Sequence, residues 1–166
     1  SVVVPILNEF KPDQVHHIVE HSEAKIFFVG DVVKPTLNVD KMPNLKAMIN
    51  IPDFSLAMSR EEKIEETQSN LEKLFVEKYP SFSKENVCYY KNENPEELAL
   101  INYTSGTSGF SKGVMIPYRA IYSNLEFGFH VLGSDTKPGD KVLSILPMAH
   151  MYGMAFEFLY EFCAGI

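Results

Sequence analysis

The residues best suited to chemistry gather in one short segment, residues 104–113. Its ten positions hold five hydroxyl side chains, three glycines and one lysine: Thr104, Ser105, Gly106, Thr107, Ser108, Gly109, Phe110, Ser111, Lys112 and Gly113. Glycines let the backbone turn and bring its amides close to a ligand, and successive amides with hydroxyls form an anion-binding concavity. Lys112 adds a compact cation that suits a phosphate oxygen. The segment therefore predicts a polyphosphate site, with a flexible Gly/Ser turn as the plainer alternative.

Comparison with short functional motifs narrows this prediction. A Walker A loop places Gly directly before Lys and Ser or Thr directly after it, whereas Ser111 precedes Lys112 and Gly113 follows it. The dinucleotide pattern GxGxxG is absent, and neither Ser105 nor Ser108 lies in the GxSxG elbow of a hydrolase nucleophile. The segment thus predicts a phosphate-binding loop that is neither a Walker A loop nor a dinucleotide-binding loop.

Histidines provide the other candidate ligands. His150 lies in an apolar run, where a histidine is ordinarily a hydrogen-bonded core residue, with ligand contact as the alternative. His17 and His21 have the i, i+4 spacing that can chelate zinc, but Ile18 stands where an HExxH motif has Glu. No third ligand accompanies this pair, so we expect no metal site.

The elements that must position these residues alternate along the chain. Apolar runs of strand length occur at residues 2–7, 25–29, 45–51, 98–103 and 142–146. Helical spacing of apolar residues marks residues 13–22, residues 59 to about 79, and the segment after Pro117. Ser59 and Glu62 have the arrangement of a capping box. This alternation predicts an α/β fold with a mainly parallel sheet flanked by helices.

Length, charge and cysteine content exclude several classes. The 166 residues correspond to about one domain. The longest segment without a charged residue spans 15 positions, fewer than the ~20 of a membrane-spanning helix. The net charge is −7, and the sequence has no cluster of Lys and Arg such as nucleic-acid binding requires, which argues against a nucleic-acid-binding protein. Cys88 and Cys163 are too few and too far apart for a disulfide scaffold, and reduced thiols without a signal peptide favour a cytoplasmic location. Apolar residues at both ends predict that the chain is part of a longer protein.

Two motifs carry a family resemblance. Residues 103–115 resemble the phosphate-loop signature of the AMP-forming acyl-CoA synthetases and their adenylating relatives. Residues 146–153 have the sequence Leu-Pro-Met-Ala-His-Met-Tyr-Gly and resemble the second core motif of that family. Their residues are similar to those of fatty acyl-CoA ligases at this motif. Ser111 stands where the family usually has Pro, and Ser108 where it often has Thr. The resemblance implies that residues 1–166 are a fragment of the large N-terminal AMP-binding domain. Residues 1–95 would form a strand–helix subregion, and residues 96–166 would carry both motifs.

The resemblance implies a two-step reaction, in which a fatty acid reacts with ATP to give an acyl-adenylate and coenzyme A then takes the acyl group. Thr104, Ser105, Gly106, Thr107, Ser108 and Gly109 would cradle the ATP phosphates, with Lys112 as a catalytic cation. His150 would be catalytic at the acyl carboxylate, and Met151, Tyr152 and Gly153 would border the acyl pocket. For the methionines, ordinary core filling is the alternative. Mg²⁺ would bridge phosphate oxygens, with its protein ligand outside this sequence.

Two other functions stay open at this stage. One is adenylation of another carboxylic acid, aryl or amino acid, and the other is a nucleotide-binding module without catalysis. The ligase hypothesis expects this fragment by itself to be inactive. A long- or medium-chain fatty acid ligase can also touch a bilayer surface to collect its substrate, so peripheral membrane contact stays open as well.

Overall fold

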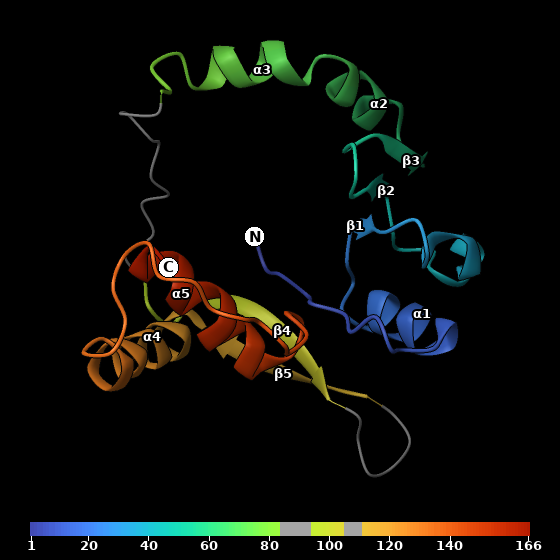
Figure 1. Ribbon diagram of the computed structural model, residues 1–166. Coiled ribbons are helices and arrows are strands. Elements are labelled where there is room, and N and C mark those ends of the chain that lie inside the picture. The colour runs from blue at the N-terminus through green and yellow to red at the C-terminus, as the bar shows by residue number, and fades with distance from the viewer. Residues whose placement is uncertain (84–93, 105–110) are drawn as a thin grey trace. The chain divides into compact units, whose positions relative to one another are not determined.

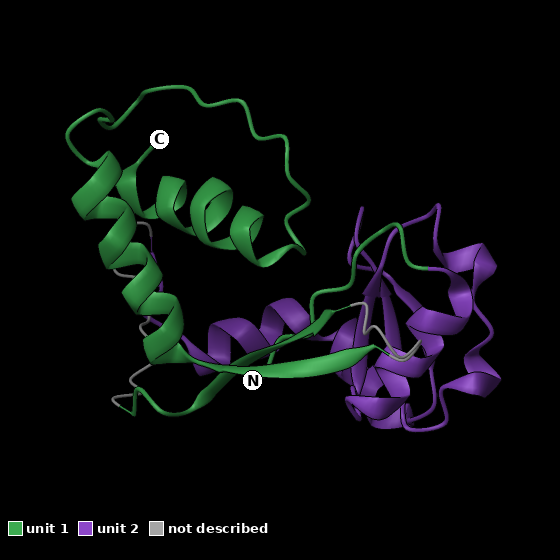
Figure 2. Cartoon of the chain, turned by 90° about the horizontal axis from the view of Figure 1, so that it is seen from below, with its two compact units in different colours: residues 1–10, 94–166 green, residues 11–93 purple. Residues whose placement is uncertain are grey.

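The computed structural model describes residues 1–83, 94–104 and 111–166. These residues form two compact units, residues 11–93 and residues 1–10 with 94–166 (Figure 2). Each unit combines helices with a small sheet, so the predicted α/β class is confirmed. The sheets are only partly parallel, which corrects the prediction of a mainly parallel sheet.

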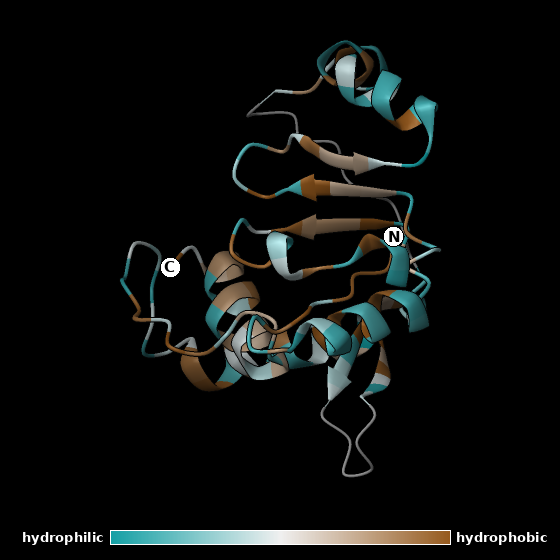
Figure 3. Cartoon of the chain, turned by 90° about the vertical axis from the view of Figure 1, so that its right-hand side faces the viewer, coloured by the Kyte–Doolittle hydropathy of each residue, from teal (hydrophilic) through white to brown (hydrophobic). Residues whose placement is uncertain are grey.

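Residues 11–93 contain a three-stranded sheet. One helix precedes the sheet in the sequence, and two helices follow it. The elements are α1 (Pro12–His21), β1 (Ile26–Val29), η1 (Lys34–Thr36), η2 (Val39–Lys41), β2 (Ala47–Asn50), β3 (Leu56–Ser59), α2 (Glu62–Ser69) and α3 (Leu71–Lys78) (Figure 1). β1 and β2 pair in parallel, and β2 and β3 pair antiparallel. β1 and β2 carry mostly hydrophobic residues (Figure 3). The core joins α1 to these two strands through Ile18, Val19, Val29, Ala47 and Met48, all almost fully buried.

The predicted helix after residue 59 is wrong in two details. Ser59 does not cap it, because the helix begins at Glu62 and the Ser59 hydroxyl instead donates to the Glu61 carbonyl at 2.9 Å. The helix also breaks at Asn70, which separates α2 from α3. Neither α2 nor α3 buries a residue completely. Tertiary packing, which supplies most helix stability in proteins, is therefore limited along this stretch.

Residues 1–10 and 94–166 contain a β-hairpin, the helix α4 and a continuous helical run over residues 151–164, which we call the last helical segment. The elements are β4 (Leu98–Thr104), β5 (Lys112–Pro117), α4 (Tyr118–Leu132), the π-helical segment η3 (Gly153–Leu159) and α5 (Tyr160–Ala164). β4 and β5 pair antiparallel. α4 approaches the last helical segment closely at Gly128, where an added Cβ would lie 2.8 Å from the Tyr160 ring. Tyr160 is 2% exposed, and its hydroxyl bonds the Thr136 hydroxyl at 2.7 Å.

Two of the predicted strands are wrong. Residues 2–7 form only an isolated parallel bridge between Val3 and Leu100, because Pro5 has no amide hydrogen to continue a ladder. Residues 142–146 form no strand, and Leu143 and Ile145 are 84% and 78% exposed. A strand needs a hydrogen-bonding neighbour, and none of the described strands pairs with this segment.

Candidate active site

The β4–β5 hairpin positions the two ends of the predicted phosphate loop. Thr104, the last residue of β4, pairs with Lys112, the first residue of β5, and both are exposed. Directly opposed residues in an antiparallel pair have Cβ atoms about 4.5–5.5 Å apart. The hairpin therefore places the Thr104 and Lys112 side chains opposite each other at the two ends of the loop segment. Ser105, Gly106, Thr107, Ser108 and Gly109 lie outside the described residues.

This hairpin was not expected from the sequence, which predicted that Lys112 lies in the loop and that a helix follows it. Lys112 and Gly113 are in fact strand residues. Gly113 pairs with Tyr103, and an added Cβ would lie 2.8 Å from Ile101 Cγ2 and 3.1 Å from Tyr103 Cζ. Tyr103 is 4% exposed, and this burial raises the pKa of its phenol. Because Gly113 has no side chain, there is room beside it for the buried ring of Tyr103 on the paired strand.

His150 lies at the start of the last helical segment and is exposed, so it is not a core histidine. Its backbone amide donates to the Pro147 carbonyl at 2.9 Å, and its carbonyl accepts from the Met154 amide at 2.8 Å. Its Nδ1 accepts a hydrogen bond from the Tyr152 amide at 3.3 Å. An imidazole that accepts at Nδ1 carries its proton on Nε2 when neutral. His150 therefore caps the helix with one nitrogen and offers a donor at the other.

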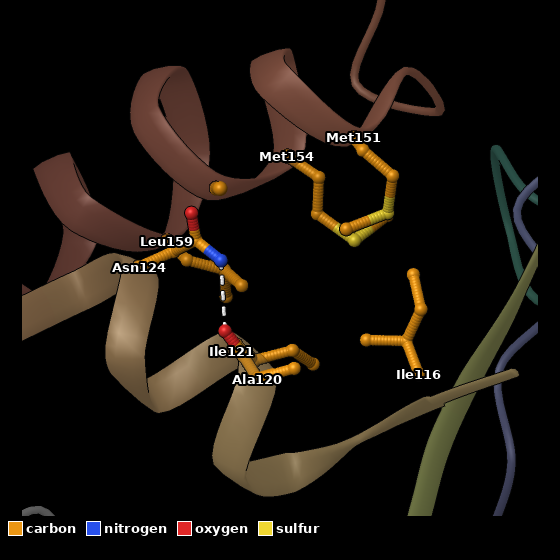
Figure 4. A pocket seen from close by; sticks show the side chains of 8 residues that line it. Ile116, Ala120, Ile121, Asn124, Met151, Met154 and Leu159 are labelled. Carbon is orange, nitrogen blue, oxygen red and sulfur yellow. Dashed lines mark hydrogen bonds between the residues drawn. The ribbon is translucent and has the colours of Figure 1, made fainter.

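The three residues after His150 differ in their surroundings. Tyr152 is 57% exposed. Gly153 is buried, and an added Cβ there would lie 2.6 Å from the Pro147 carbonyl oxygen. Met151 lines a small apolar pocket formed also by Ile116, Ala120, Ile121, Asn124, Met154, Ala155 and Leu159 (Figure 4). The volume of this pocket is about 20 Å³, room for about one water molecule.

Sequence reasoning missed Asn102, which links the two motifs. Asn102 lies in β4, is 8% exposed, and donates from Nδ2 to the Ala149 carbonyl at 3.2 Å. Ala149 directly precedes His150. The available signal was a single amide inside the otherwise apolar run of residues 98–103, since buried amides are normally hydrogen-bonded.

Glu157 was also missed. Its Oε2 accepts hydrogen bonds from the Ser144 hydroxyl at 2.7 Å and from the Ile145 and Leu146 amides, each at 2.9 Å. The Leu146 amide, then the Ser144 hydroxyl and the Ile145 amide, hold the pKa of this carboxyl below its ordinary value. Glu157 thereby fastens the extended segment before His150 to the helix that follows it.

The described residues contain no group of three His, Cys, Asp or Glu side chains that could hold a metal ion. The rings of His17 and His21 lie 5.4 Å apart in α1. No helix in the described part of the chain is long and apolar enough to cross a membrane.

Sequence comparison matches the chain to one family model and to relatives that are named as fatty acid–CoA ligases. The family model described as AMP-binding enzyme matches residues 1–166. Long-chain-fatty-acid–CoA ligase 5 of Rattus norvegicus is 28% identical over 172 residues, covering 99% of this chain and 24% of that protein. Long-chain-fatty-acid–CoA ligase 1 of Homo sapiens is 27% identical over 164 residues, covering 94% of this chain and 23% of that protein. The chain thus spans about a quarter of the length of these relatives.

Solved structures agree on the fold. The anthranilate CoA ligase in complex with anthranoyl-AMP matches with a TM-score of 0.70 and 16% identity, covering 99% of this chain and 29% of that one. ATP-bound MatB from Rhodopseudomonas palustris matches with a TM-score of 0.67 and 18% identity, again covering 99% of this chain and 29% of that one.

Proposed function

The chain belongs to the AMP-binding enzyme family, and from this premise we propose that it is a portion of the large N-terminal domain of a fatty acid–CoA ligase. The complete enzyme would activate a fatty acid with ATP and transfer the acyl group to coenzyme A. Residues 1–95 would be a strand–helix subregion and residues 96–166 the part that carries the site. The compact units group residues 1–10 with 94–166, so the first ten residues would support that site.

The observation that carries the proposal is the pairing of Thr104 with Lys112 at the base of the glycine-rich loop. In the first step, a substrate carboxylate oxygen attacks the α-phosphorus of ATP, and the bond to the bridging oxygen breaks to release pyrophosphate. Lys112 would offset the charge that develops on this leaving group, while Thr104, Ser105, Gly106, Thr107, Ser108 and Gly109 would hold the β- and γ-phosphates. Fixed donors aimed at developing charge are a large term in such catalysis.

His150 would act on the carboxylate. In the neutral tautomer that its Nδ1 bond favours, Nε2–H is free to donate to one carboxylate oxygen and so orient the other for attack. Met151, Tyr152 and Gly153 would border the acyl pocket. In the second step, the coenzyme A thiolate attacks the acyl carbon and AMP leaves. Mg²⁺ would be held by phosphate oxygens, with its protein ligand outside this sequence.

A fatty acid as substrate is supported by the relatives named as long-chain fatty acid ligases. An aryl acid is the second candidate, because one of the similar structures is an anthranilate CoA ligase. An amino acid substrate, and a nucleotide-binding module without catalysis, are the remaining alternatives. We place the long- or medium-chain ligase in the cytoplasm, with peripheral contact to a membrane as a way to collect its substrate.

The substrate proposal is tested by ATP–pyrophosphate exchange with the full-length parent protein. We expect fatty acids of medium or long chain to drive exchange, and coenzyme A to convert the adenylate into a thioester. Exchange driven only by aromatic or amino acids would replace the substrate class. The 166-residue fragment should bind ATP weakly or not at all, whereas saturable, tight ATP binding to the fragment would favour a nucleotide-binding module.

His150 has its own test. In the full-length protein, His150→Ala should raise KM for the carboxylate by about 10-fold or more, because one charge-assisted hydrogen bond is worth about 1.5–3 kcal/mol, while KM for ATP changes little. His130→Ala, an exposed histidine on α4, is the matched control. A larger rise in KM for ATP than for the acid would move His150 to the nucleotide side.

A further inference from the structure

Asn102 connects the strand that leads into the phosphate loop with the backbone that carries His150. We infer that Asn102 is a positioning residue, which sets the place of His150 relative to Thr104 and Lys112. The chemical meaning of this inference rests on the proposed function. The physical connection does not, since it follows from the hydrogen bond between the Asn102 amide and the Ala149 carbonyl.

The geometry of β4 places both candidate groups on one side of the hairpin. Side chains two positions apart on a strand point to the same face, so Asn102 and Thr104 share a face of β4. Two residues of strand span about 6.6 Å. Because Asn102 holds the carbonyl next to His150, the helix start that carries His150 is fastened to the face on which Thr104 lies. A carboxylate at His150 and a triphosphate at Thr104 and Lys112 would then be brought to the same side of the sheet.

The burial of Asn102 makes this bond costly to lose. The side chain is 8% exposed and lies 47 positions before its acceptor in the sequence. A buried donor left without its acceptor costs about 1–3 kcal/mol, so the strand and the helix start favour the single arrangement that satisfies it. His150 is itself exposed, and its side-chain bond goes to the amide of Tyr152 in its own helix. That local bond orients the ring but does not relate it to the hairpin, which is the role we assign to Asn102.

The first experiment compares variants of the full-length protein in acid-dependent ATP–pyrophosphate exchange. Asn102→Leu keeps the volume and removes the donor. Since a misplacement of about 1 Å can cost about 100-fold, we expect kcat/KM for the carboxylate to fall by about 10- to 100-fold, with KM for ATP within about 3-fold of the wild type. Asn70→Leu is the matched control, because the Asn70 side-chain amide donates to the Glu66 carbonyl at 2.8 Å, four residues back in α2. Equal losses for the carboxylate and for ATP would overturn the inference.

The second variant, Asn102→Asp, adds a pH signature. An ionised carboxylate would repel the Ala149 carbonyl, whereas a protonated one can donate to it. We expect KM for the carboxylate to be raised at high pH and to return toward the wild-type value as the pH falls, a dependence that a loss of packing would not produce. A pH profile of the same shape as that of the wild type would count against the inference.

A chemical readout separates this inference from the proposed function. The rate at which diethyl pyrocarbonate modifies His150, followed by peptide mass spectrometry, requires no substrate. We expect Asn102→Leu to change this rate by about 3-fold or more relative to His130 in the same molecule, because the backbone at Ala149 is released. If no carboxylic acid supports exchange, the proposed function fails while this rate still decides the role of Asn102. If exchange is normal and the rate is unchanged, Asn102 does not position His150.

Discussion

The two compact units of this chain differ in their apolar burial and in whether they carry the candidate site residues. In residues 11–93, polar side chains form hydrogen bonds to backbone groups that lie far apart in the sequence. The Arg60 guanidinium donates to the carbonyls of Met42, Pro43 and Leu45 through Nη1 and to that of Val39 through Nη2, at 2.7–3.1 Å. The buried His16 accepts the Asn38 amide at Nε2. These bonds surround a core in which α1 packs on β1 and β2.

The unit of residues 1–10 and 94–166 has less apolar burial and carries every residue assigned to the site. Among the residues that the structure describes, its almost fully buried apolar side chains are Ala99, Leu100, Tyr103, Ala155 and Tyr160, whereas the other unit buries eight in the same way. Both units also expose large apolar side chains, among them Phe127 and Phe162 in this unit and Phe54 and Val76 in the other. Among the described residues, apolar burial is therefore greater in residues 11–93, whereas the proposed site residues lie in the other unit. Substitutions in the two units should separate effects on stability from effects on chemistry.

The largest expected effect is on chemistry. In the full-length protein, Lys112→Ala should slow adenylate formation by about 100- to 1,000-fold, the usual cost of removing one fixed group that stabilises developing charge. Rapid-quench measurement of the acyl-adenylate checks this. Lys141→Ala, an exposed lysine of the same unit, should leave the rate unchanged. Adenylate formation at the wild-type rate in the Lys112 variant would remove this residue from the mechanism.

The next effect is on stability. Arg60→Met should lower the local free energy of unfolding around β1 and β2 by about 2–3 kcal/mol, because charged hydrogen bonds to four carbonyls are lost. Hydrogen exchange of the β2 amides in the full-length protein measures this. Arg119→Met is the matched control in the other unit, since its exposed ion pair with Glu96 is worth less than about 1 kcal/mol. Equal losses from both variants would contradict the contrast between the units.

The smallest effect depends on pH and lies at Glu157. Its folded-state pKa is lowered, chiefly by the Leu146 amide. The bonds of its carboxylate therefore contribute stability above the unfolded pKa of about 4.5 and lose it as the pH falls through the folded value. We expect protection of the Ile145 and Leu146 amides from hydrogen exchange to decrease in that acidic range. Glu157→Ala should remove this protection at neutral pH too, whereas Glu126→Ala should not. If neither the lower pH nor Glu157→Ala reduces the protection of these two amides, Glu157 does not hold residues 144–146 in place.

Local sequence signals predicted several elements well. Residues 13–22 were expected as a helix and form α1 at Pro12–His21, because Val15, Ile18 and Val19 recur at helical spacing. The expected strands at residues 25–29, 45–51 and 98–103 correspond to β1, β2 and β4. The helix after Pro117 forms as α4, and Pro117 directly precedes it.

Other expectations failed where the partner decides the structure. Residues 142–146 are as apolar as β4, yet they form no strand because no described strand pairs with them. β5 was missed because its exposed residues Val114 and Met115 do not alternate clearly with polar ones. Strand identity depends on a hydrogen-bonding neighbour, and a single segment does not reveal where that neighbour lies.

The candidate site divides in the same way. By its residue types alone, the sequence predicted that residues 104–113 suit a polyphosphate, because hydroxyls, glycines and lysine carry their chemistry wherever they lie. The place of His150 in a second motif came from the family resemblance of residues 146–153. Only the tertiary structure decided that Thr104 faces Lys112, that His150 caps a helix through Nδ1, and that Asn102 reaches Ala149. These relations join residues 2 to 47 positions apart. They depend on strand register and helix direction, which are set by packing across the whole unit rather than by local sequence.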